Sequence, residues 1–363
     1  MSKGKYNIIK SMGIYTASNV LNAAIPFLLL PVLTNYLSTE DYGVLSNFGA
    51  LVGLMVPLVG FNLMASAQVQ YLKDDVDNQS YISSGLRLAF ILTLIFTLVS
   101  FLFGNSLEAE IGIPKHFLNI VAVYALFNTV IEILLAIWRM EDKAINYGVF
   151  RISRTILELS LVLIFVVGFR MDFVGSIYGM VIAYLSGCAV ALIILMRKKL
   201  VLGSFSMKYL RHALGYGVPL IPHTLSGVAI MYSDKLILTH YHGLAVNGIY
   251  TVGFMVGQIV GLMQNSFNQA WVPWVFKKLK NGTERDKVRM VKITYIYIVA
   301  ILLFVFALWL IVPFIYTFFG DDFQSGMTLV LWIAIGFAFN GMYKMVSVYL
   351  FYAERTMIIA YTS

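Results

Sequence analysis

The sequence predicts an all-α polytopic membrane protein with ten transmembrane helices. Three observations support this prediction: 60% of the 363 residues are hydrophobic, only 12% are charged, and the mean hydropathy is +0.81. Soluble domains carry about a quarter charged residues, so this chain is solvated by lipid. A β-barrel would need short strands of alternating hydrophobicity, whereas the apolar runs here are long and continuous.

Ten apolar segments are long enough to cross a bilayer, for which a helix needs about 20 apolar residues. The first segment is too long for a signal-peptide core and lacks a clear cleavage site, so we expect it to be retained. The predicted spans are residues 12–37, 43–66, 84–104, 117–138, 153–169, 173–196, 214–241, 246–272, 293–319 and 326–350.

The connections between these spans alternate in charge. One set holds 22 of the 26 basic residues, including four that we assign to one loop: Arg139, Lys143, Arg151 and Arg154. The other set is acidic or neutral, as at Glu40 and Asp41. Because basic loops stay on the cytoplasmic side, the N-terminus is predicted to be cytoplasmic.

Several functional classes are excluded by what the sequence lacks. It shows no metal-ligand spacing, nucleophile elbow or phosphate loop, so we expect no metal, no cofactor and no enzyme. A membrane glycosyltransferase or polymerase would need a long loop with catalytic groups, and no loop is long enough. Nucleic-acid binding would need a soluble basic domain. The lone Cys188 rules out an intrachain disulfide.

The second half of the chain repeats the first. At a shift of 205 residues, Thr34 falls on Thr239, Gly43 on Gly248 and Ser46 on Thr251. Internal repeats are the usual construction of transporters, with the substrate site between them. We therefore predict an N-terminal lobe (1–200), a basic cytoplasmic linker (201–212) and a C-terminal lobe (213–363).

The second lobe contains four predicted spans where the first contains six. The last residues, 357–361, resemble the start of an eleventh span. We expect a fragment of a twelve-span protein with an incomplete second lobe. The alternative is a genuine ten-span protein.

The order of several short motifs resembles the polysaccharide transporter, or O-antigen flippase, branch of the multidrug/oligosaccharidyl-lipid/polysaccharide exporter superfamily, which includes the MATE transporters. The motifs are Pro31-Val32-Leu33-Thr34, Pro219-Leu220-Ile221-Pro222-His223, Ser233-Asp234-Lys235-Leu236, Gly248-Ile249-Tyr250 and 267–273 (FNQAWVP). The resemblance covers nearly the whole chain. It implies a MATE-like fold of two pseudo-symmetric six-helix lobes, of which the second is incomplete here.

The resemblance also implies a function. The expected cargo is an undecaprenyl-diphosphate-linked oligosaccharide, moved by alternating access, with ion-gradient coupling, from the cytoplasmic to the periplasmic leaflet of the bacterial inner membrane. Further expected partners are membrane lipids, a polysaccharide polymerase and a chain-length regulator. Two alternatives stay open: an ion-coupled multidrug antiporter of the same superfamily, and an inactive truncated fragment.

Such a cargo needs cations for its diphosphate and amides for its sugars. Asp234 and Lys235 lie in an apolar run, where an unused charge is costly. The alternative is that they form an inter-helix ion pair or that Lys235 reaches the membrane interface. The amides of the apolar spans are sugar-binding candidates, or else form ordinary interhelical hydrogen bonds. They are Asn19, Asn22, Gln258, Asn265, Asn268 and Gln269.

Gating or coupling is predicted for a second set of residues. Glu132 and Lys344 occupy near-equivalent positions in spans four and ten, and could meet as a gate or pair within their own lobes. Pro219 and Pro222 kink the seventh span, which could bend during transport or stay fixed. His223 could titrate, or serve as a hydrogen-bonded structural residue.

Overall fold

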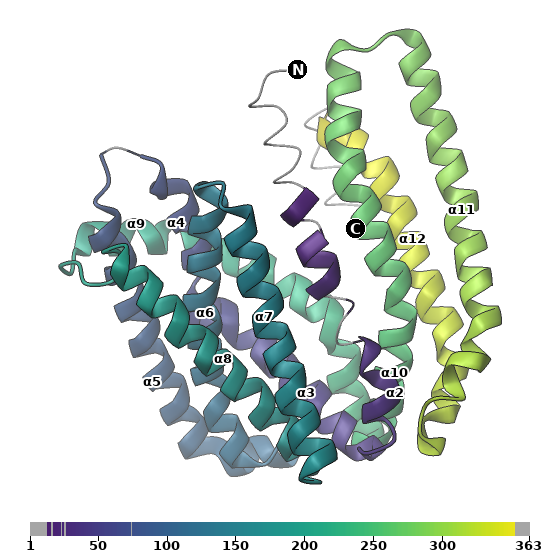
Figure 1. The fold of residues 1–363 in the computed structure, drawn as a ribbon, viewed down its shortest axis with the longest axis horizontal. Coiled ribbons are helices and arrows are strands. Elements are labelled where there is room, and N and C mark those ends of the chain that lie inside the picture. The colour runs from purple at the N-terminus through teal and green to yellow at the C-terminus, as the bar shows by residue number, and fades with distance from the viewer. Residues whose placement is uncertain (1–12, 16, 23, 25–26, 74, 353–363) are drawn as a thin grey trace. The chain divides into compact units, whose positions relative to one another are not determined.

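The computed structural model describes residues 13–15, 17–22, 24, 27–73 and 75–352. These residues form helices and connecting turns, without a β-strand among them (Figure 1). The elements are α2 (Leu30–Leu33), α3 (Thr39–Gly60), α4 (Leu63–Tyr71), α5 (Asn78–Ile111), α6 (Lys115–Met140), α7 (Ala144–Leu163), the π-helical η1 (Ile164–Gly168), α8 (Asp172–Arg197), α9 (Met207–Gly217), the 3-10 helix η2 (Val218–Leu220), α10 (Ile221–Asn281), α11 (Glu284–Tyr316), the 3-10 helix η3 (Asp321–Gly326) and α12 (Met327–Tyr352). The predicted start of an eleventh span, 357–361, lies outside the described residues.

The helices confirm a multi-pass membrane protein, but not the number of ten spans. In the described part, seven helical stretches are long and apolar enough to cross a membrane. One of them, Met207–Lys280, contains two predicted spans, which Gly243 separates with a φ of 85° and a ψ of 174°. The predicted span 12–37 is only partly described, and α7 is not among the seven stretches.

Local signals set the helix ends. Ser38 caps α3, and its hydroxyl accepts from the backbone N–H of Asp41, whose carboxylate accepts from the Ser38 N–H in return. This reciprocal arrangement satisfies backbone donors that a helix start leaves open. Gly112 ends α5 with a φ of 72°, a left-handed conformation that glycine adopts without strain.

The chain forms two compact units. Unit 1 contains Met1–Leu29 and Leu33–Gly248, and unit 2 contains Leu30–Val32 and Ile249–Ser363. The division falls after Gly248, whereas the sequence places a linker at 201–212. Much of that linker forms the start of α9, which packs on α4 and α5 within unit 1. The boundaries of the two lobes stay a prediction.

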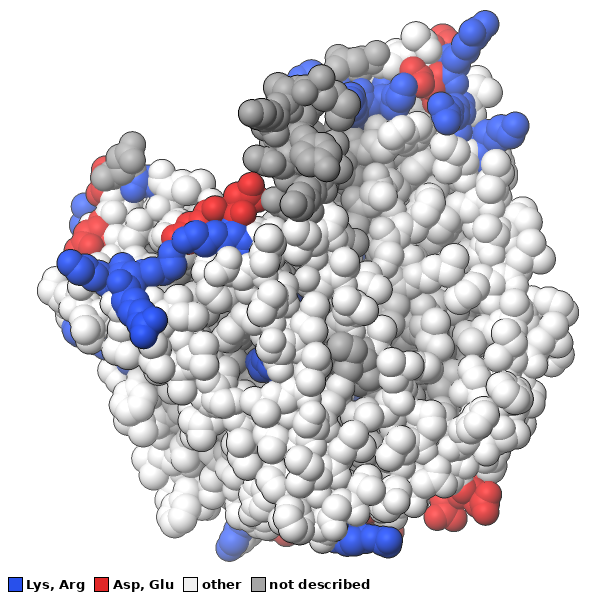
Figure 2. Space-filling model, in the orientation of Figure 1, with Lys and Arg blue, Asp and Glu red and all other residues white. Residues whose placement is uncertain are grey.

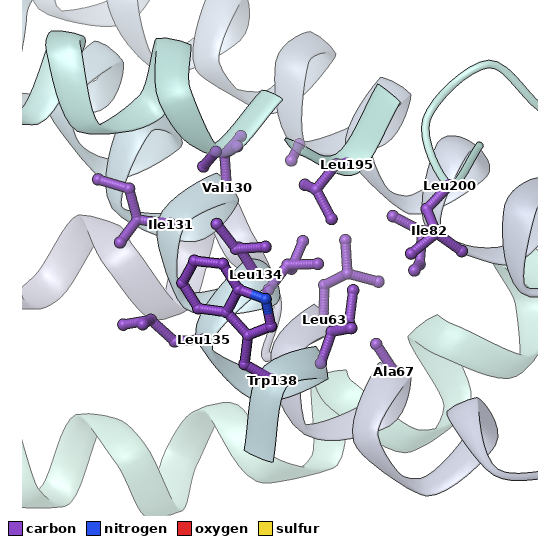
Figure 3. Packing of buried hydrophobic residues seen from close by; sticks show 14 of the residues in the cluster. Leu63, Ala67, Ile82, Val130, Ile131, Leu134, Leu135, Trp138, Leu195 and Leu200 are labelled. Atoms are coloured by element: carbon purple, nitrogen blue, oxygen red, sulfur yellow. The ribbon is translucent and has the colours of Figure 1, made fainter. Parts of the chain in front are cut away.

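The main core of unit 1 lies among α4, α5, α6, α8 and α9. Figure 3 shows Trp138 of α6 beside Leu134 and Leu135, with Leu63 of α4 and Leu195 of α8 around the same space. In lipid there is no hydrophobic driving force between apolar helices, so close packing must hold them together. Trp138 is 5% exposed and Leu63 is fully buried, as this packing requires.

In unit 2, the second half of α10 packs closely on α12. A Cβ added at Gly257 would lie 2.6 Å from Ile333, and one added at Gly261 would lie 2.7 Å from Phe337. These glycines belong to the motif Gly253-x-x-x-Gly257-x-x-x-Gly261, whose small residues let helix backbones approach. The motif is therefore a stripe of close packing.

In both units, charged side chains gather towards the helix ends, and the surface between them is largely uncharged (Figure 2). The exposed apolar side chains of α5 and α11 illustrate the lipid-facing surface, such as Phe101 at 73% and Leu303 at 61%. Apolar residues exposed to this degree suit a lipid environment.

Candidate functional site

A polar pocket of about 490 Å³ lies within unit 1, between α3, α4, α6 and the first half of α10. We refer to it as the polar pocket. Its size falls in the range of small-molecule binding sites, which are mostly apolar with a few placed polar groups. It is lined by Gly49, Val52, Gly53, Val56, Pro57, Gly60, Asn62, Leu63, Met64, Tyr124, Asn128, Thr129, Glu132, Thr224, Val228 and Tyr232.

Glycines make the room for this pocket on the α3 side. A Cβ at Gly53 would lie 3.2 Å from Val228 and 3.4 Å from the ring of Tyr232. A Cβ at Gly60 would lie only 2.7 Å from the hydroxyl of Thr129. Larger residues at these positions would push α3 away from α6 and α10.

The polar groups of the pocket come mainly from one face of α6. Asn128 and Glu132 are four residues apart, so their side chains project from the same face of the helix. The adjacent Thr129 donates its hydroxyl to the Ala125 carbonyl at 2.8 Å, and its oxygen retains lone pairs. Asn62 donates to the Gly217 carbonyl at 3.2 Å, which ties the pocket wall to α9. Carboxylate, amide and hydroxyl groups therefore share one cavity.

Two tyrosines form the aromatic part of the wall. Tyr124 of α6 lies against Tyr184 of α8, with ring centroids 4.2 Å apart. Tyr232 of α10 lies near Gly49 and Gly53 of α3. An apolar ring face beside polar groups suits a ligand that has both polar and apolar surfaces.

Lys235 lies directly behind this wall. Its ammonium sits 4.9 Å from the ring centroid of Tyr232, a cation–π distance, and the residue is 5% exposed. Its backbone N–H donates to the Asp234 carboxylate at 2.8 Å. Lys235 is thus a buried residue that touches a lining residue, and does not itself line the pocket. Its predicted contact with substrate stays a prediction, as does that of Asp234.

The two predicted amides of the first span bind α7. Asn19 accepts from the Tyr147 hydroxyl at 3.1 Å, and Asn22 accepts from the Thr155 hydroxyl at 2.5 Å. These are interhelical hydrogen bonds, the alternative that the sequence left open. They hold the described part of the first span on α7.

In unit 2, Asn265 and Lys344 come together. The Lys344 ammonium donates to the Asn265 side-chain oxygen at 2.8 Å, and Gln264 donates to the same oxygen at 3.1 Å. Gln264 also donates to Asn340 at 3.2 Å. Elsewhere on the same helix, Asn268 has a buried side-chain oxygen without a hydrogen-bond partner among the described residues.

Other predicted residues of unit 2 are more scattered. Gln258 is half-buried and Gln269 is exposed. Glu132 lies in the polar pocket of unit 1, whereas Lys344 belongs to unit 2. Their meeting as a gate therefore stays a prediction.

Pro219 lies in η2, where the chain passes from α9 into α10 as a short 3-10 turn. Proline lacks the N–H that an α-helix needs at this point. Pro222 follows as the second residue of α10, and His223 is exposed. The predicted kink and its bending during transport both stay predictions.

A partly buried ion pair in α7 went unnoticed in the sequence. Arg154 lies 3.6 Å from Glu158 one turn later, and its guanidinium carbon lies 4.1 Å from the ring centroid of Tyr184. Assigning Arg154 to a cytoplasmic loop was wrong, because α7 already begins at Ala144 and the Arg154 side chain is 11% exposed. The i, i+4 spacing of opposite charges was the signal that could have revealed the pair.

A second buried network joins α3 to α10. Asn47 donates to the Ile111 carbonyl at 2.7 Å, and Thr239 and Asn247 complete the network. Next to it, a Cβ at Gly248 would lie 1.8 Å from the Thr39 carbonyl oxygen and 3.1 Å from the Gly43 nitrogen. Only glycine fits this crossing of α3 with the helix that follows Gly243.

At the predicted cytoplasmic ends, Glu141 forms a hub just after α6. Its carboxylate accepts from Lys198 at 2.6 Å, from the Tyr71 hydroxyl at 2.6 Å and from Lys143 at 2.9 Å. Burial by itself raises the pKa of Glu141, but these hydrogen bonds outweigh it and lower the pKa to about 2. The hub ties the ends of α4, α6 and α8 together.

The fold defines a class of protein. The chain is similar to a multidrug resistance MATE family transporter of the MOP superfamily in its inward-facing conformation, with a TM-score of 0.69 and 16% identity over 90% of this chain and 80% of that one. It also resembles an outward-facing structure of a MATE family transporter, with a TM-score of 0.57 and 17% identity over 93% and 82% of the two chains. The chain therefore has a MATE-like transporter fold.

The sequence of the chain shows the family to which it belongs. Residues 8–280 match the model of the family described as "Polysaccharide biosynthesis protein", and the chain belongs to this family. It is 25% identical to an "Uncharacterized membrane protein" of Haemophilus influenzae over 77% of this chain and 68% of that protein. It is 22% identical to "Lsg locus putative protein 1" of the same organism, over 75% and 67%.

Proposed function

We propose that this chain is a flippase for an undecaprenyl-diphosphate-linked oligosaccharide. It would carry the sugar head from the cytoplasmic to the periplasmic leaflet of the bacterial inner membrane by alternating access, coupled to an ion gradient. Membership of the polysaccharide biosynthesis family and the transporter fold support this proposal. A polysaccharide polymerase and a chain-length regulator are the partners that would consume the exported unit.

The polar pocket is the observation that carries the proposal. A sugar presents hydroxyl donors at its rim and C–H groups on its faces. Glu132 and Asn128 accept from hydroxyls, while Tyr124 and Tyr232 offer ring faces to the C–H surface. A cavity of about 490 Å³ accommodates part of an oligosaccharide rather than a whole chain. Glu132 would accept hydrogen bonds from the sugar, and Lys235, beside Tyr232, would attract the diphosphate as the head group passes towards the periplasmic side.

The test is complementation of a flippase-deficient strain. The unmodified chain should restore surface glycan, and Glu132→Gln should reduce it because a charged acceptor is lost. Glu40→Gln, at an exposed position of α3, is the matched control. If the chain fails while a version extended by two further spans succeeds, this sequence is a fragment whose activity needs the rest. If neither restores glycan, the flippase proposal is wrong.

A multidrug antiporter is the second candidate. One carboxylate beside two aromatic rings, as in Glu132 with Tyr124 and Tyr232, also suits an organic cation. Expression of the chain in a drug-sensitive strain separates the two proposals. Raised resistance to cationic dyes without restored glycan would favour the antiporter.

A further inference from the structure

A second cavity, of about 530 Å³, lies between α7 and α8. We refer to it as the α7–α8 groove. Its lining is mostly apolar, with Ile145 at 62%, Val149 at 61% and Val190 at 45% exposure, and it also includes the polar residues Asn146, Ser153 and Ser186. Trp138 of α6 also lines it, and the largely buried Arg154 is its main charged lining residue. The groove is therefore open along its side to the surroundings of the helices.

The length of the groove corresponds to one membrane leaflet. Its lining on α7 runs from Ile145 to Leu157, which are twelve residues apart. At 1.5 Å per residue this is about 18 Å, close to half of the roughly 30 Å hydrocarbon core. The positive-inside rule puts the Ile145 end at the cytoplasmic surface. The groove thus spans the cytoplasmic leaflet.

Charge marks the cytoplasmic end of the groove. Residues 139–151 and 197–199 flank this end and contain six basic residues against two acidic ones. Two of the basic residues, Lys198 and Lys143, pair with Glu141, so the net excess at this end is four positive charges (six basic minus two acidic residues). An anionic phosphate at the membrane surface is attracted to such a cluster. A lipid with an apolar chain and an anionic head at the cytoplasmic interface matches both the apolar groove and the basic cluster at its end.

We propose that the α7–α8 groove binds the isoprenoid tail of a polyprenyl diphosphate, with the diphosphate at the basic end. This proposal rests on the proposed function. A polyprenyl carrier has one chain and a doubly phosphorylated head, and the structure offers one groove with an excess of basic residues at its end.

The groove and the polar pocket share structural elements. The Arg154 guanidinium lies on Tyr184, and Tyr184 packs on Tyr124 of the polar pocket. On α6, Glu132 lines the pocket and Trp138 lines the groove, six residues or about 9 Å further towards the cytoplasm. One carrier could therefore place its tail on one side of α6 and α8 while its sugars occupy the other.

Photo-crosslinking tests the proposal. The purified 363-residue chain would be labelled with a polyprenyl diphosphate that carries a diazirine on one of the isoprenes nearest the diphosphate, and the labelled peptides mapped by mass spectrometry. Label should appear on α7 between Ile145 and Leu157 and on α8 near Val190. Label confined to other helices would overturn the proposal without the use of any variant.

Two tryptophan variants sharpen this experiment. Val149→Trp fills the groove and should weaken labelling about tenfold, equivalent to roughly two methylene groups expelled from it. Ile156→Trp is the control, because Ile156 is 53% exposed on the same helix and does not line the groove. Equal labelling of both variants would contradict the proposal.

Competition and transport separate the remaining outcomes. Excess phosphatidylglycerol should leave the labelling unchanged; if it abolishes labelling, the groove is a general phospholipid site and the proposal fails. Vesicles would report the flipping of a lipid-linked oligosaccharide by the same chain. If the chain flips the lipid without label in the groove, the groove is not the tail-binding site, and the proposed function stands. If label appears in the groove but the lipid is not flipped, the proposed function is wrong, and the groove stands as a binding site.

Discussion

Asn247 donates its side-chain amide to the side-chain oxygen of Asn47 at 2.9 Å, although 200 residues separate the two. Both residues are fully buried. Thr239 bonds to each of them, so three helical segments of unit 1 meet in one polar network. A buried donor that loses its partner costs about 1–3 kcal/mol, which makes this network sensitive to substitution.

Asn47→Leu should therefore destabilise the protein by about 1–3 kcal/mol, because it removes the hydrogen bonds that Asn47 makes with Asn247, Thr239 and the Ile111 carbonyl. Thermal unfolding in detergent measures the effect. Asn105→Leu is the control, since Asn105 is exposed and accepts only from Lys115. Equal melting temperatures for the two variants would show that the network contributes little.

Gly248→Ala should destabilise the protein, because the new Cβ would overlap the Thr39 carbonyl. Overpacking typically costs about 1–3 kcal/mol, and more when backbone must move. A Cβ added at Gly227, in the helical part of α10 before Gly243, would meet nothing within 4 Å, so Gly227→Ala should be neutral or stabilise by about 0.4–1 kcal/mol. The prediction fails if both variants melt alike.

Arg154→Leu should destabilise the protein by about 1–3 kcal/mol, since it leaves the partly buried Glu158 carboxylate without its cation. The double variant Arg154→Leu with Glu158→Leu should recover much of this loss, because apolar residues replace the whole pair. Detergent unfolding of the two single variants and the double variant gives the coupling energy. If the double variant lost as much unfolding free energy as the two single variants together, the pairing would be ruled out.

Glu141→Gln should destabilise the protein in a pH-dependent way. The pKa of Glu141 is lowered from 4.5 to about 2 in the folded protein. Such a carboxyl stabilises the fold at a pH above its unfolded pKa, and this stabilisation is lost as the pH falls through its folded pKa. The difference in melting temperature between the two proteins should be full at pH 7 and shrink between about pH 5 and 2. A difference that is constant over this window would contradict the assigned role of the charge.

Lys235→Ala should abolish glycan export at normal membrane abundance if the lysine serves the diphosphate. Lys235→Arg should retain part of the activity, since arginine keeps the charge and the contact with the Tyr232 ring. Complementation with immunoblots of membrane fractions measures both. Full export by Lys235→Ala would remove the residue from the site.

Much of the fold was predictable because lipid imposes a simple rule. Every spanning segment must satisfy its own backbone groups, so long apolar runs become helices. The runs at 84–104 and 326–350 became parts of α5 and α12. The sequence was less accurate at helix ends, because α5 continues to Ile111 and α7 begins at Ala144 with polar residues. Hydropathy alone does not show where such extensions stop.

The candidate site was predictable only in part. Glu132 stood out as a carboxylate in an apolar run, and it does line the polar pocket. Tyr124 and Tyr232 were not singled out, because aromatic residues are frequent in this chain and their partners come from distant segments. The same reason hid Glu158, whose environment depends on Tyr184 of the next helix through Arg154. Packing between helices decides which polar residues share a cavity.

The close approach of Gly43 and Gly248 bears on the origin of the chain. These positions correspond under the 205-residue shift, and a Cβ at Gly248 would lie 3.1 Å from the Gly43 nitrogen. Two equivalent points can touch only near the rotation axis that relates them, as in the isologous interface of a homodimer. The contact is what duplication and fusion of a half-length ancestor would leave behind, with a glycine retained in each copy where the two ancestral subunits once met.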